Sequence, residues 1–109
     1  MKLSEFQSEL KFVDAAGIYS IKSEAITDST KGLDIPGFLE SMIKSGVTEN
    51  SEFLYLLHNG SRCFLRRLND LFLIVALKSL VDVNKVLLEM KSKDLLQSYT
   101  TRWPWLKKS

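Results

Sequence analysis

The sequence predicts an α+β fold, a single-layer five-stranded antiparallel sheet flanked by helices on both faces, with elements in the order α-β-β-α-β-β-β-α. The main observation is a set of three apolar runs, over residues 53–57, 62–68 and 71–77. His58-Asn59-Gly60-Ser61 and Asn69-Asp70 separate them. Asn-Gly tolerates the positive φ that a tight hairpin turn needs, so the runs predict a three-stranded meander. The second observation is helical periodicity in the segments before and after these runs.

The three runs differ in how they should be buried. The third, Leu71 to Leu77, has no polar residue, so we expect it to lie centrally with helices on both sides. It is too short to cross a bilayer, which needs roughly 20 apolar residues. The second run carries Arg62, Arg66 and Arg67, which suits a strand nearer the edge with one wetter face. The first run is apolar but lateral, and a long apolar edge invites pairing with another chain.

The N-terminal part of the chain predicts a helix and two strands. Ser4 and Gln7 have capping-box spacing, which favours a short amphipathic helix over residues 5–13. A strand is expected over residues 18–22. Residues 24–27 form a weaker candidate strand, polar enough to lie at an edge of the sheet.

Two further helices flank the meander. Asp34 can cap a helix that tolerates Pro36 in its first turn and ends at Gly46. Its apolar stripe consists of Ile35, Phe38, Leu39, Met42 and Ile43. After the meander, Asp82 can cap a last helix, with Val81 and Val86 at hydrophobic-staple spacing. Apolar residues lie on two sides of this last helix, so it is either buried on both sides or interrupted near residues 91–94, and we favour a kink or break there.

Length and composition bound the remaining possibilities. The 109 residues suffice for one domain, expected over 1–99, with a basic aromatic tail over 100–109. A net charge of +2 is too small to predict nucleic-acid binding. The single Cys63 fits a reducing compartment, and the polar start shows no apolar leader. We therefore expect a cytoplasmic protein without a transmembrane segment.

The sequence shows no pattern typical of catalysis. It has no glycine-rich phosphate loop, and His58 with Cys63 cannot form a four-ligand zinc site. These two residues flank a turn and could pair as nucleophile and base, but a solvated histidine and an apolar cysteine are the commoner roles. We expect a protein that is not an enzyme, with no cofactor and no metal.

The element order resembles that of the roadblock/LC7 family, and the resemblance covers about residues 2–99. The most similar stretches are Leu65-Arg66-Arg67-Leu68-Asn69-Asp70-Leu71-Phe72-Leu73-Ile74-Val75-Ala76-Leu77 and Val81-Asp82-Val83-Asn84-Lys85-Val86-Leu87-Leu88-Glu89-Met90. The resemblance implies one helix on one sheet face and two on the other. It also implies dimerisation through the helix over residues 36–45 and the strand over residues 53–57. The implied dimer interface consists of Phe38, Leu39, Met42, Ile43, Phe53, Tyr55 and Leu57, although the helical residues could equally be core.

By the same resemblance we expect a non-catalytic dimeric adaptor or regulator. Its partners would be a second copy or a related roadblock-like subunit, and a nucleotide-binding protein such as a small Ras-like GTPase, or a motor or scaffold complex. Possible partner contacts are Arg62, Arg66, Arg67, Trp103 and Trp105. One alternative is a nucleic-acid-binding module that uses the strand from Arg62 to Arg67. Another is a small ligand-binding sensory domain.

Overall fold

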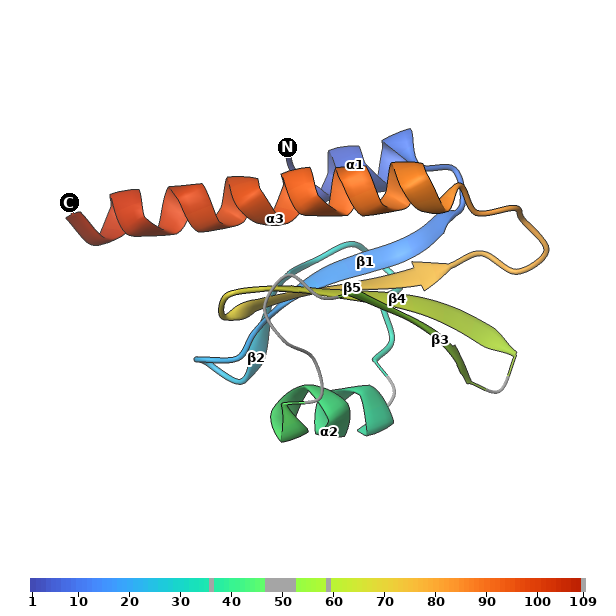
Figure 1. Ribbon diagram of the computed structural model, residues 1–109, viewed down its shortest axis with the longest axis horizontal. Coiled ribbons are helices and arrows are strands. Elements are labelled where there is room, and N and C mark those ends of the chain that lie inside the picture. Colours follow the sequence, from blue (N-terminus) through green and yellow to red (C-terminus); the bar gives the residue numbers. More distant parts are fainter. Residues whose placement is uncertain (36, 47–52, 59, 109) are drawn as a thin grey trace.

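A five-stranded antiparallel sheet lies between helices on both faces, which confirms the predicted fold class and element order (Figure 1). The computed structural model describes residues 1–35, 37–46, 53–58 and 60–108, without the side chains of residues 58 and 101–108. The helices are α1 (Leu3–Glu9), α2 (Gly37–Ser45) and α3 (Lys85–Lys108). The strands are β1 (Val13–Ser20), β2 (Ala25–Ser29), β3 (Phe53–His58), β4 (Ser61–Leu68) and β5 (Leu71–Leu77).

The strand order across the sheet is β2-β1-β5-β4-β3. β5 is therefore the central strand, and five of its seven residues are buried, as its unbroken apolar run predicts. Both predicted hairpins form with two-residue turns, since His58 pairs with Ser61 and Leu68 with Leu71. Gly60 and Asn69 have positive φ in these turns, of 79° and 54°. The apolar β3 and the polar β2 are the two edge strands, as expected.

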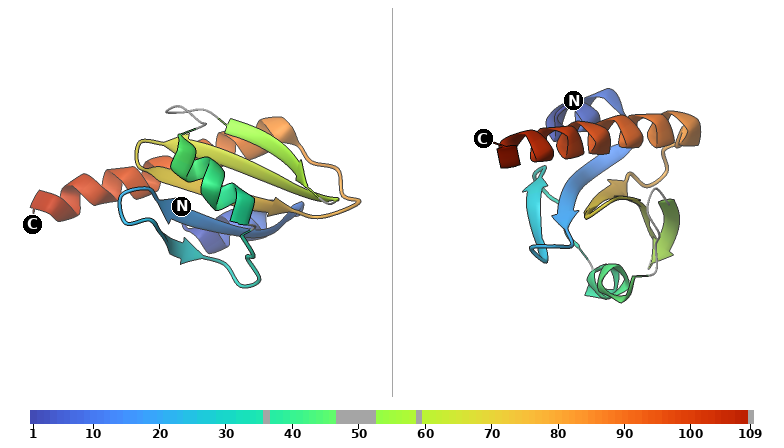
Figure 2. Two further views of the ribbon diagram at one scale, coloured as in Figure 1. Left: turned by 90° about the horizontal axis from the view of Figure 1, so that it is seen from below. Right: turned by 60° about the vertical axis from the view of Figure 1, so that its left-hand side comes forward.

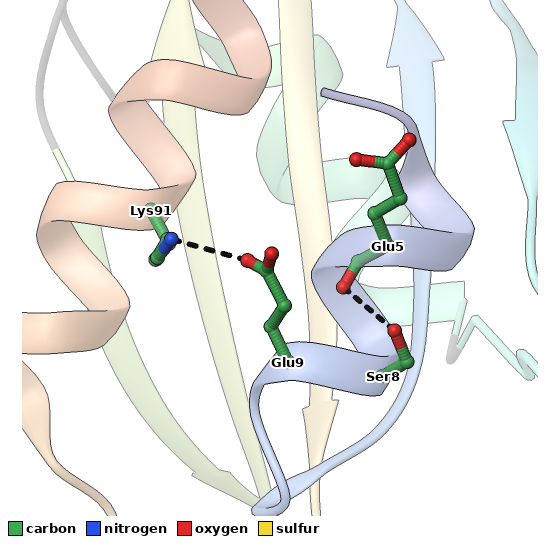
Figure 3. Close-up of polar contacts among 4 residues, drawn as sticks. All are labelled: Glu5, Ser8, Glu9 and Lys91. Atoms are coloured by element: carbon green, nitrogen blue, oxygen red, sulfur yellow. Dashed lines mark hydrogen bonds and ion pairs between the residues drawn. The ribbon is translucent and has the colours of Figure 1, made fainter.

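Each face of the sheet carries its own apolar cluster. α1 and α3 cover one face, where the buried side chains include Phe6, Ile18, Phe64 and Leu73 (Figure 2). α2 covers the other face alone, over a smaller cluster. Lys91 Nζ lies 3.1 Å from Glu9 Oε2 and joins α3 to α1 across their exposed sides (Figure 3). The sheet thus places α2 on the opposite side of the molecule from both chain ends (Figure 1).

The N-terminal helix is shorter and starts earlier than predicted. α1 spans Leu3–Glu9, so Ser4 lies inside the helix and does not cap it. The N-cap residue is Lys2, no side-chain capping bond forms there among the described residues, and Gln7 instead donates to the Asp14 carbonyl. β1 begins at Val13, which pairs with Leu77 of the central strand. Pairing in the sheet thus prevails over helical periodicity at residues 10–13.

α3 is continuous, so the predicted break at residues 91–94 is wrong. A single stripe of Leu88, Ser92, Leu95 and Leu96 is fully buried against the sheet and α1. Ser92 fits into this stripe because its hydroxyl donates to the Glu89 carbonyl at 2.9 Å and is thereby satisfied. The apolar residues on the other side, Val86 and Met90, remain 71% and 58% exposed. The helix needs no break, because one of its two apolar sides faces solvent.

The cap of α3 is Asn84 and not Asp82. The Asn84 side-chain oxygen accepts a hydrogen bond from the Leu87 amide at 3.1 Å. Because the cap is Asn84, the hydrophobic-staple positions are Val83 and Leu88 instead of Val81 and Val86. Val83 and Leu88 both belong to the apolar cluster on this face of the sheet.

Asn84→Ala should therefore lower the free energy of unfolding by about 1 kcal/mol, because it leaves a helix amide without a partner. Asp82→Ala is the matched control and should have a much smaller effect. Urea denaturation of both variants measures the difference. An equal loss in the two would contradict the assignment of the cap.

α3 continues through the predicted tail to Lys108, and in Figure 1 its C-terminal part extends beyond the sheet. The side chains of Trp103 and Trp105 lie outside the described residues. Within the described part of the chain, no helix is both long enough and apolar enough to cross a bilayer.

Candidate functional site

The open edge of β3 is the main candidate site. Because His58 and Ser61 close a two-residue hairpin, they form a hydrogen-bonded pair, and so do Leu56 with Cys63 and Leu54 with Leu65. Hydrogen-bonded and non-hydrogen-bonded pairs alternate along an antiparallel hairpin, so the backbone N–H and C=O groups of Phe53, Tyr55 and Leu57 point away from β4. Among the described residues, no strand pairs with β3 on this side. The edge therefore offers three residues' backbone groups for pairing with another strand.

The side chains of the same three residues point to the α3 side of the sheet. Tyr55 donates from its hydroxyl to Glu89 Oε2 at 3.0 Å, and Lys85 Nζ lies 4.9 Å from its ring centroid. Burial and the bond to the Glu89 carboxylate hold the pKa of Tyr55 well above its usual range. The hydroxyl therefore stays protonated and fixes β3 to α3.

Phe53 and Leu57 are the exposed apolar members of this edge. Leu57 is 74% exposed and Phe53 is 37% exposed. The Phe53 ring stacks on Phe64 at 5.9 Å between centroids, and the Arg66 guanidinium lies 5.3 Å from its centroid. The edge strand thus packs on its neighbours through one side, while Phe53 and Leu57 leave apolar surface exposed along it.

Only some of the α2 residues in the predicted dimer interface lie on the outside of the molecule. Leu39 and Ile43 are buried in the protein's own core, beneath the helix. Phe38 and Met42 are half-buried at the rim of that cluster. Among the predicted α2 residues, Phe38 and Met42 are therefore the ones that retain apolar surface for a partner.

The three arginines of β4 do not share one wet face, which corrects the prediction for that strand. Arg62 and Arg66 lie on the α3 side, where Arg62 Nη2 donates to the Val81 carbonyl at 2.8 Å and Arg66 Nη1 to the Glu89 carbonyl at 2.8 Å. Arg67 points to the other face, over the Phe72 ring, and donates from Nε to the Asn69 carbonyl at 2.9 Å. Each guanidinium is therefore engaged within the fold.

Arg66→Met should lower the free energy of unfolding by about 1 to 3 kcal/mol. The change keeps the apolar stem but removes charged hydrogen bonds from the partly buried Glu89 carbonyl and from the buried Ser92 hydroxyl. Arg67→Met is the control, because the Arg67 side chain donates to the carbonyl of an exposed turn, and it should cost less than half as much. Urea denaturation measures both, and a larger loss in Arg67→Met would contradict this view of β4.

His58 and Cys63 give no support to nucleophilic catalysis. The His58 side chain lies outside the described residues. Burial raises the pKa of the Cys63 thiol, which disfavours the reactive thiolate. Among the described residues, no three His, Cys, Asp or Glu side chains lie close enough to hold a metal ion.

Two hollows were not predicted from the sequence. One, of about 110 Å³, lies between α2 and the β1–β2 hairpin, with Tyr19 and Ile43 among its lining residues. The other, of about 460 Å³, is a wider surface depression between α1, the end of β2 and Tyr99. No motif identifies either, because their residues come from segments far apart in the sequence.

The chain matches no protein-family model, and no curated protein is similar enough to it to count as a relative.

Proposed function

We propose that this protein is a non-catalytic homodimeric adaptor, joined through β3 and α2, that acts on a nucleotide-binding partner protein. The observation that carries the proposal is the open apolar edge of β3, beside the half-exposed Phe38 and Met42. The element order, with one helix on one face of the sheet and two on the other, is also that expected from the roadblock/LC7 resemblance.

A two-fold axis through the β3 edge gives a self-complementary arrangement. Two copies of β3 run antiparallel with Tyr55 opposite its mate, so that Phe53 of one copy faces Leu57 of the other. The outward backbone groups of three residues in each chain then find partners, at a net gain of about 0.5 to 1.5 kcal/mol per hydrogen bond. The result is one continuous sheet across both copies, with no β3 edge left open.

The same symmetry explains how such a dimer could bind a partner. An axis perpendicular to the sheet places both copies of α2 on one face and both copies of α3 on the other. The exposed Val86 and Met90 of α3 then occur twice on a broad surface. A nucleotide-binding protein, such as a small Ras-like GTPase, is the partner that the family resemblance implies.

A pull-down in two nucleotide states tests the adaptor function. The tagged wild-type protein and its Met42→Glu variant are incubated with extract of the native host, with GDP or with a non-hydrolysable GTP analogue. We expect mass spectrometry to find a nucleotide-binding protein that is enriched in one nucleotide state and is lost with Met42→Glu. Recovery of no nucleotide-binding protein above a tag-only control would contradict the proposal.

A further inference from the structure

A small cleft on the α2 side of the sheet is lined in part by Tyr19, whose buried hydroxyl has no partner among the described residues. This α2–β2 cleft, of about 110 Å³, is lined by Tyr19, Glu24, Ala25, Ile26, Ile35, Glu40 and Ile43. Tyr19 is 4% exposed, and its hydroxyl has no hydrogen-bond partner among the described residues. It is the one buried side-chain polar atom in the described part of the chain with this property. Buried hydroxyls normally have a partner, so this one marks a place where a ligand can supply it.

The rim and the walls of the α2–β2 cleft differ in chemistry. Glu24 and Glu40 are exposed and bring two carboxylates to the rim, and Lys44 Nζ lies 3.5 Å from Glu40 at the outer side of α2. Ile26, Ile35 and Ile43 provide apolar walls, and Ile43 is buried. The residues that line the cleft therefore combine apolar walls with one unpartnered hydroxyl and two carboxylates.

We propose that the α2–β2 cleft binds a small organic monocation, an alkylammonium or alkylguanidinium group whose aliphatic chain packs on the isoleucines. The cationic group is a hydrogen-bond donor, and the Tyr19 hydroxyl and the two glutamate carboxylates are acceptors. The volume is well below the roughly 300 to 1,000 Å³ of sites for drug-sized ligands, which excludes a nucleotide. It exceeds the roughly 10 to 15 Å³ that a single water needs.

The site does not rest on the proposed dimer. On the α2 helix, Glu40 projects from the flank that faces β2, and Phe38 and Met42 project from the opposite flank. A monomeric Met42→Glu protein should therefore bind the same ligand with unchanged affinity. Loss of the dimer and loss of the cleft are thus separate results.

A titration with n-butylammonium chloride tests the proposal, with nuclear magnetic resonance signals of Ala25 and Ile43 as the readout. We expect the shifts to saturate in the millimolar range, because a ligand of so few atoms offers little contact. Neutral n-butanol, and sodium or calcium chloride at matched ionic strength, should not reproduce them. Equal shifts with n-butanol or with either salt, or no saturation with n-butylammonium, would overturn the proposal.

Two variants separate ligand binding from folding. Tyr19→Phe removes the hydroxyl alone, so the free protein should be at least as stable as wild type while the affinity for n-butylammonium falls about tenfold or more. Glu40→Gln should also weaken binding, whereas Glu5→Gln, an equal charge change on α1 across the sheet, should not. Unchanged affinity in Tyr19→Phe would overturn the site even if n-butylammonium binds.

The source of the cationic group is decided by a second probe. A capped Gly-Lys-Gly peptide carries the same butylammonium group on a backbone. Tighter binding of the peptide than of n-butylammonium would assign the cleft to a lysine side chain of another protein. Weaker binding of the peptide would assign it to a free amine, and both results support the alkylammonium chemistry.

Discussion

The Ile74→Asp protein is expected not to fold. Ile74 lies in the middle of the central strand β5, is 2% exposed, and packs among Tyr19, Leu39 and Leu65 beneath α2. A carboxylate there has no described partner and no access to water, and an unpaired buried charge costs several kcal/mol. Since a domain of this size has a total stability of about 5 to 15 kcal/mol, we expect most of the molecules to be unfolded.

Circular dichroism with thermal denaturation measures this outcome. Ile74→Val is the matched control, and it should fold cooperatively with a loss of about 0.5 to 1.5 kcal/mol. A soluble Ile74→Asp protein with a cooperative transition near that of wild type would show that β5 is not the centre of the core.

The Met42→Glu protein is expected to be monomeric and folded. Met42 is half-buried at the rim of the α2 cluster, so a glutamate at this position can reach solvent in the monomer. In a two-fold dimer the substitution is present in both copies and places two like charges close together. Each glutamate also faces the apolar rim of the other copy. Removal of each Met42 side chain from the interface also forfeits up to about 1.5 to 3 kcal/mol of apolar burial.

Light scattering at tens of micromolar protein distinguishes the two states. Wild type should have twice the 12.5 kDa chain mass, and Met42→Glu should have the chain mass with an unchanged circular dichroism spectrum. Gln97→Glu is the control, because it adds the same charge to exposed α3 on the other face of the sheet. A monomeric wild type, or a Met42→Glu protein that remains dimeric, would contradict the proposed interface.

The meander was the most predictable part of the fold, because local signals specify it. Asn59-Gly60 and Asn69-Asp70 mark turns in which the described residues Gly60 and Asn69 have positive φ, and the seven apolar residues of β5 allow no exposed face. The N-terminal helix was less predictable. Residues 10–13 satisfy a helical stripe, but Val13 gains a partner in Leu77 across the sheet, and no local pattern encodes that contact.

The last helix shows why apolar periodicity can mislead. Leu88 and Leu95 lie on one side of the helix, and Val86 and Met90 lie on another. This pattern suggested a helix that is either buried on two sides or broken. The sequence could not show that Val86 and Met90 remain exposed, or that Ser92 lies inside the buried stripe with its own turn carbonyl as acceptor.

The candidate site was predictable only in part. The exposure of the β3 edge followed from its position in the meander, but the burial of Leu39 and Ile43 depends on how α2 lies on the sheet. The α2–β2 cleft was not predictable. In the sequence Tyr19 is a tyrosine in an apolar strand, and only the structure shows that its hydroxyl has no partner among the described residues.

Amide hydrogen exchange along β3 tests the central claim, pairing of this edge with a second copy, most directly. Leu54 and Leu56 bond to β4 within the chain, so their amides should be protected in wild type and in Met42→Glu alike. The amides of Phe53, Tyr55 and Leu57 should be protected in wild type, more so at higher protein concentration, and should exchange rapidly in Met42→Glu. Rapid exchange of these three amides in wild type at tens of micromolar would contradict the account.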